Sequence, residues 1–128
     1  MSEESRKFAD DFFSGVEEEE YPFTVPNAKT GEPLGDIFLK RVKQPIIDKY
    51  RDLRNGEGRR KGNPAAARRY LFKQAYKRFE FLEPGCEIDL GDSPNEVEFF
   101  IRKAEMLVDA VLIEYLAKVF PDVLDPKG

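Results

Sequence analysis

The strongest constraint on the fold is the apolar pattern of residues 93 to 120. Apolar side chains recur there in steps of three and four, at Val97, Ile101, Ala104, Val108, Val111 and Tyr115. Five more widen this stripe beyond half of a helical circumference: Phe100, Leu107, Leu112, Leu116 and Val119. The spacing predicts one long α-helix, with a wider apolar face than an ordinary surface helix needs. We expect it to be the central helix of the core; a role in an oligomer interface is the alternative.

The ends of this helix also have sequence signals. In "DSPNE", residues 92 to 96, Ser93 is predicted as the N-cap and Pro94 as the first helical residue. Glu96 then completes a capping box. Pro121 is expected to end the helix because proline cannot continue it.

A β-hairpin is predicted near the N-terminal end of the chain. Two β-rich segments, 21 to 25 and 36 to 42, flank a stretch rich in Asn, Gly and Pro, which is typical of a hairpin with a long loop. Pro22 and Pro26 have no N–H to donate to a neighbouring strand. We therefore expect the first strand at an edge of the sheet.

Two helices are predicted between the hairpin and the long helix. Pro45 opens the first, which "NGEG" at 55 to 58 ends. A basic loop covers residues 56 to 62, and Asn63 is predicted as the N-cap of a helix reaching residue 82. The apolar stripe of that helix is Leu71, Phe72, Ala75, Phe79 and Leu82.

These elements predict an α+β, helix-dominant fold, with an N-terminal β-hairpin followed by about three helices, the last one long and apolar. A purely helical protein without an ordered hairpin is the alternative. A chain of 128 residues is the size of one domain. We expect an acidic N-terminal segment over residues 1 to 20, either flexible or a short amphipathic helix, a globular domain over 21 to 122, and a C-terminal tail over 123 to 128.

The composition argues against most catalytic chemistry. The chain has no histidine, which removes His-based nucleophilic sites and His-ligated zinc. Cys86 is the only cysteine, and the acidic residues around it disfavour a reactive thiolate. The carboxylates of residues 87 to 96 do not have calcium-loop spacing, and no phosphate-binding glycine motif is present. We predict a protein that is not an enzyme, with no catalytic residue, no cofactor and no metal.

The sequence also indicates a cellular location. The N-terminal residues do not have the pattern of a secretory signal, and no stretch is apolar enough to span a membrane. A single cysteine fits a reducing compartment. We therefore expect a cytoplasmic protein that does not interact with membranes.

Charge is distributed unevenly along the chain. The net charge is −4, yet residues 40 to 79 carry fourteen Lys and Arg against three Asp and Glu. One interpretation is a single positive face formed by Lys40, Arg41, Lys43, Arg59, Arg60, Lys61, Arg68, Arg69, Lys73, Lys77 and Arg78. With Tyr70 and Tyr76 as stacking surfaces, such a face would suit a nucleic acid. The other interpretation is a set of solvated helix faces that balance the acidic segments or meet an acidic protein.

The layout resembles that of the tail assembly chaperones of long-tailed bacteriophages and prophages. The similarity covers roughly residues 20 to 120 and lies in the order of elements and in two phrases, "YLFKQAYKRFEFLEPG" and "DSPNEVEFFIRKAEML". It implies a small, mostly helical, non-enzymatic protein of the host-cell cytoplasm that associates with the tape-measure protein. It also implies a longer form made by translational frameshifting. The family supplies no binding residue by position, and the resemblance does not extend to the basic block.

The sequence thus supports two functional hypotheses. The first is an assembly chaperone or adaptor that binds a protein partner and can also self-associate. If the last helix is not wholly buried, its partner-facing residues are predicted to be Phe100, Leu107, Leu112 and Leu116. The second is a small nucleic-acid-binding module that uses Arg59, Arg60, Lys61, Arg68 and Arg69. A structural subunit of a virion or another complex is a third and weaker hypothesis.

Overall fold

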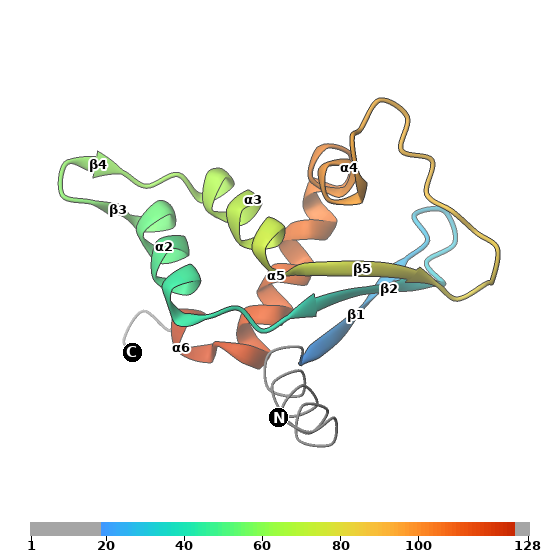
Figure 1. Ribbon diagram of the computed structural model, residues 1–128, viewed down its shortest axis with the longest axis horizontal. Coiled ribbons are helices and arrows are strands. Elements are labelled where there is room, and N and C mark those ends of the chain that lie inside the picture. Colours follow the sequence, from blue (N-terminus) through green and yellow to red (C-terminus); the bar gives the residue numbers. More distant parts are fainter. Residues whose placement is uncertain (1–18, 125–128) are drawn as a thin grey trace, which may run out of the picture.

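The computed structural model describes residues 19 to 124 and has the predicted α+β architecture (Figure 1). Strands β1 (Glu20–Pro26) and β2 (Pro33–Lys40) form an antiparallel hairpin, and β5 (Tyr76–Phe81) pairs with the other side of β2. The strand order β1-β2-β5 places β1 at an edge, as its two prolines require. The predicted hairpin is confirmed.

The two faces of the sheet differ in polarity because side chains alternate along each strand. Phe23, Val25, Ile37 and Leu39 are buried on the inner face and contribute to the core.

Strand β2 can approach β5 closely because residue 35 is a glycine. A Cβ added to Gly35 would lie 2.3 Å from the carbonyl oxygen of Glu80.

Helices α2 (Gln44–Asn55) and α3 (Pro64–Ala75) pack against each other and are joined by a short hairpin (Figure 1). The N-cap prediction for α3 is confirmed, since Asn63 Oδ1 accepts a hydrogen bond of 3.1 Å from the N–H of Ala66. The predicted basic loop contains two short strands, β3 (Gly56–Glu57) and β4 (Arg60–Lys61).

The prediction of one helix from 64 to 82 is wrong in its second half. Helix α3 ends at Ala75, and Tyr76 takes extended backbone angles, φ −62° and ψ 130°. Phe72, Ala75 and Phe79 do have helical spacing, but from residue 78 the sequence also alternates between charged and aromatic side chains. Pairing with β2 stabilises the strand, because it places Phe79 opposite Ile37 and Arg78 opposite Phe38, with the Arg78 guanidinium over the Phe38 ring.

The prediction of one long apolar last helix is also wrong, because the structure has two helices in this part of the chain. Helix α4 (Glu96–Lys103) and α5 (Glu105–Val119) are separated at Ala104, whose φ of −137° and ψ of 47° are not helical. A short helix, α6 (Pro121–Leu124), follows. The N-cap of α4 is Asn95, whose Oδ1 accepts from the N–H of Glu98 at 2.9 Å, and not Ser93.

Helix α5 is the central helix of the core. Its inner side contacts α3 and β1 and buries Val108, Val111, Leu112, Tyr115, Leu116 and Val119. Beyond the break at Ala104, α4 also contacts α3, and its Phe100 packs in an aromatic cluster with Phe72, Tyr76 and Phe79. The two helices therefore cover different parts of the core.

The globular domain expected over residues 21 to 122 falls within the described range. The segment expected over 1 to 20 and the tail expected over 123 to 128 lie mostly outside it. Within residues 19 to 124, no helix is long and apolar enough to cross a membrane.

Candidate functional site: an exposed helix face and a basic groove

The structure places the predicted partner-binding residues mainly in the core. Phe100, Leu112 and Leu116 are only 5%, 2% and 1% exposed, and Leu107 is half-buried. These side chains pack against other parts of the same domain. Their prediction as a partner-facing surface is therefore wrong for the three buried residues, because they belong to the face of α4 and α5 that the domain itself covers.

Helix α5 exposes a different set of apolar side chains. Met106 is 86% exposed and Ile113 is 58% exposed, and the small side chains of Ala110 and Ala117 between and after them are also exposed. These four residues are spaced by four, three and four, which places them on one side of a helix. We call them the outer stripe of α5. Sequence reasoning missed the stripe because α5 is apolar on both sides, so its periodicity did not show which side was buried.

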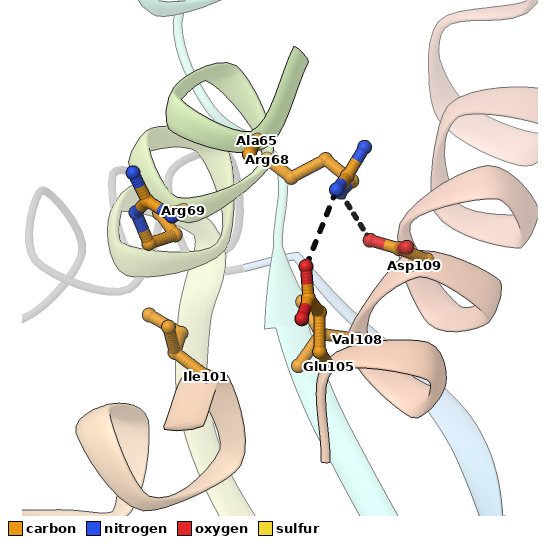
Figure 2. Close-up of a pocket in the computed structure, with 7 residues that line it drawn as sticks. All are labelled: Ala65, Arg68, Arg69, Ile101, Glu105, Val108 and Asp109. Carbon is orange, nitrogen blue, oxygen red and sulfur yellow. Dashed lines mark hydrogen bonds and ion pairs between the residues drawn. The ribbon is translucent and has the colours of Figure 1, made fainter. Parts of the chain in front are cut away.

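Four of the five predicted nucleic-acid-binding residues are exposed, and Arg68 is the exception. Arg59, Arg60 and Lys61 are exposed on the β3–β4 hairpin. Arg68 lies between α3 and α5, and its guanidinium pairs with Glu105 at 3.5 Å and with Asp109 (Figure 2).

Arg68 and Arg69 line a small pocket of about 70 Å³ together with Ala65, Ile101, Glu105, Val108 and Asp109. Figure 2 shows the Arg69 side chain directed away from the ion pairs of Arg68. The ion pairs of Arg68 with Glu105 and Asp109 therefore connect α3 with α5.

A second concavity is much larger, with a volume of about 970 Å³. It lies where the end of β2, the start of α2, the α3–β5 junction and Phe120 meet. Its lining residues are Lys40, Arg41, Val42, Lys43, Gln44, Ile46, Gln74, Tyr76, Lys77 and Phe120. Four of them are cationic and none is acidic, so we call this site the basic groove.

Local irregularities of the fold position the cations of the groove. In the β2–β5 ladder, Phe38 pairs with Arg78 and Leu39 with Tyr76, which leaves Lys77 as the extra residue of a β-bulge. A bulge commonly redirects a side chain relative to regular alternation. Lys40, Arg41 and Lys43 come from the segment that leaves β2 and enters α2.

A buried tyrosine of α5 fixes that segment. The Tyr115 hydroxyl accepts a hydrogen bond from the N–H of Val42 at 3.3 Å and donates one to the carbonyl of Lys40 at 2.7 Å. Burial raises the pKa of Tyr115 to about 12. The neutral hydroxyl of this core residue therefore holds the backbone of Lys40 and Val42, which line the groove.

Glu20 provides an acidic contact beside the groove. Its carboxylate accepts from Arg78 Nη1 at 2.7 Å and lies 3.1 Å from Lys77 Nζ. Hydrogen bonds from Arg78 and then Lys77 hold the pKa of Glu20 below its usual value. This part of the rim already binds a carboxylate.

The aromatic residues of the groove already have partners. The Tyr76 hydroxyl donates a 2.7 Å hydrogen bond to Glu96, and burial raises the Tyr76 pKa. The guanidinium of Arg41 lies 5.2 Å from the centre of the Phe120 ring.

Between residues 19 and 124, no three acidic or cysteine side chains come close enough together to hold a metal ion. No protein-family model, no curated protein and no solved structure matches this chain.

Proposed function

We propose that this protein is a non-enzymatic adaptor or assembly chaperone that binds a protein partner through the outer stripe of α5. The observation that carries the proposal is the exposure of Met106 and Ile113, two large apolar side chains on one face of the central core helix. Ala110 and Ala117 alternate with them. This arrangement suits the approach of a helix, because small residues leave space for the side chains of the partner.

The size of the stripe indicates what it can bind. From Met106 to Ala117 it spans about 17 Å at the usual rise of a helix, which matches about three turns of a partner helix. Complete burial of an exposed Met or Ile side chain contributes roughly 1.5–3 kcal/mol. Two such anchors suit an amphipathic helix that inserts its own apolar residues at positions i, i+3, i+4 and i+7.

The resemblance to tail assembly chaperones suggests the identity of the partner. In those proteins the partner is the tape-measure protein, and the association precedes polymerisation of the tail tube. We propose the same role in the host-cell cytoplasm for this chain, with the outer stripe replacing Phe100, Leu112 and Leu116 as the contact surface.

The test is co-expression with the tape-measure protein of the same genome, followed by affinity purification of the complex. The variant Met106→Glu/Ile113→Glu places two charges on the stripe, and we expect it to reduce co-purification at least about tenfold, since buried unpaired charges are costly. The matched control is Leu34→Glu/Leu82→Glu, which changes two exposed leucines at 38% and 60% exposure away from α5.

Co-purification that survives the stripe variant, or that both double variants lose equally, would contradict the proposal. Sedimentation of the chain alone distinguishes self-association from partner binding. A dimer that only the stripe variant dissociates would identify a second copy as the occupant of the stripe.

The nucleic-acid-binding module remains the second candidate, and one observation favours it. Arg59, Arg60 and Lys61 are consecutive and exposed on the β3–β4 hairpin, where phosphates could reach them. The ion pairs of Arg68 reduce the predicted site to these three residues and Arg69.

A further inference from the structure

We propose that the basic groove is a second binding site, independent of the outer stripe, and that its ligand is an acidic segment of a protein chain. The residues that would contact the carboxylates are Lys40, Arg41 and Lys43, while Lys77, which also lines the groove, already pairs with Glu20. The ligand class is an extended peptide rich in Glu or Asp.

The charge of the groove favours an acidic ligand. Four cations and no carboxylate line it, and within the described part of the chain Lys40 and Lys43 form no ion pair. Helix α2 begins in the same place with no acidic residue in its first turn, so its N-terminal dipole adds positive potential. A concave site with charge of a single sign concentrates ligands of the opposite charge.

Glu20 shows how a carboxylate binds at this rim. It contacts both Arg78 and Lys77, with distances of 2.7 and 3.1 Å, and its pKa is lowered as a result. Lys77 also lines the groove. Glu20 therefore shows that a cation of this groove can form a charge-assisted interaction with a carboxylate.

The remaining lining favours a peptide over a nucleic acid. Stacking on free aromatic faces supplies much of the affinity for single strands, but the Phe120 ring already contacts Arg41, and the Tyr76 ring packs against Phe72 and Phe100. Gln74 offers amide donors and an acceptor, which match a peptide backbone, and Gln44, whose Nε2 donates to Asp48 at 2.9 Å, adds its amide oxygen as an acceptor. Val42 and Ile46 add an apolar surface for intervening side chains.

The experiment is fluorescence anisotropy of the full chain with three labelled probes at low and physiological salt. The probes are a short peptide of alternating Glu and Ala, the same peptide with Gln in place of Glu, and a thymidine oligonucleotide. The variant Lys40→Gln/Lys43→Gln removes two groove cations. The control Lys29→Gln/Lys103→Gln removes two exposed cations elsewhere, for an equal change of net charge.

We expect the Glu peptide to bind and the Gln peptide not to bind. Loss of two exposed charge pairs should weaken binding about five- to tenfold in the groove variant, with little change in the control or in Met106→Glu/Ile113→Glu. Three outcomes would overturn the proposal: no binding of the Glu peptide, equal weakening in the groove variant and its control, or tighter binding of the oligonucleotide that only the groove variant loses. Because the stripe variant is included, failure of the groove is distinguished from failure of the proposed adaptor function.

Discussion

At the scale of single residues, Tyr115 links the core to the basic groove. Its side chain is fully buried, and its hydroxyl bonds to the backbone of Val42 and Lys40, which lie more than seventy residues away in the sequence. No local sequence signal indicates such a bond. The periodicity identified Tyr115 as an apolar position of a helix, but the use of its hydroxyl depends on the tertiary structure.

The substitution Tyr115→Phe keeps the ring and removes both hydrogen bonds. The N–H of Val42 is then left without a partner in a buried place, which costs roughly 1–3 kcal/mol. We expect the free energy of unfolding, measured by urea denaturation, to fall by about 2 kcal/mol. The control is Tyr70→Phe, because the half-buried Tyr70 hydroxyl has no hydrogen-bond partner in the described structure. Equal effects of the two substitutions would rule out this role for Tyr115.

At the scale of elements, the sequence predicted correctly those helices and strands whose ends are set by neighbouring residues in the chain. The β1–β2 hairpin was identified from its prolines and its turn residues, and α3 was identified from Asn63 and Pro64. The two errors lie where distant contacts decide. Strand β5 forms because it pairs with the free edge of β2. Helices α4 and α5, separated at Ala104, both contact α3, but only α4 brings Phe100 to the aromatic cluster.

Gly35 tests the contact that turns residues 76 to 81 into a strand. An alanine Cβ there would meet the Glu80 carbonyl oxygen at 2.3 Å and the Phe79 ring at 2.7 Å, so β2 and β5 would have to separate. We expect Gly35→Ala to lower the free energy of unfolding by about 3 kcal/mol or more.

Substitution of a second glycine serves as the control, because it measures the cost of replacing a glycine where no atom clashes with the added Cβ. Gly85→Ala, at φ +85° with no atom within 4 Å of the added Cβ, should cost only about 1–2 kcal/mol for the left-handed conformation. Thermal unfolding followed by circular dichroism compares the two variants. An equal or smaller effect at residue 35 would show that β5 can withdraw from β2 without penalty.

At the scale of the whole molecule, the two candidate surfaces were accessible to sequence reasoning to different degrees. The cations of the groove all lie within the basic block that the sequence identified. The sequence did not show which cations of that block come together, because this depends on how β2, α2, α3 and β5 are arranged around the groove. The outer stripe could not be separated from the core stripe by periodicity, because both are apolar and share one helix.

The stability of the folded domain should also respond to alkaline pH through its buried tyrosines. Burial raises the pKa of Tyr115 from 10 to about 12, so between these values the unfolded chain loses this proton while the folded chain keeps it. Stability therefore falls as the pH rises above 10, by about 1.4 kcal/mol per pH unit from Tyr115 alone. Tyr76, whose pKa is also raised by burial and by its hydrogen bond to Glu96, acts in the same direction.

The comparison of the wild type with Tyr115→Phe isolates this contribution, because lysines and the other tyrosines titrate in both proteins. Urea denaturation at a series of pH values from neutral to about 12 gives the free energy of unfolding of each. We expect the difference between them to be constant below pH 10 and to shrink above it, because only the wild type loses the stability contributed by a buried, protonated Tyr115. A difference that does not change with pH would mean that the Tyr115 hydroxyl ionises as readily in the folded domain as in the unfolded chain, and the buried link between core and groove would then be wrong.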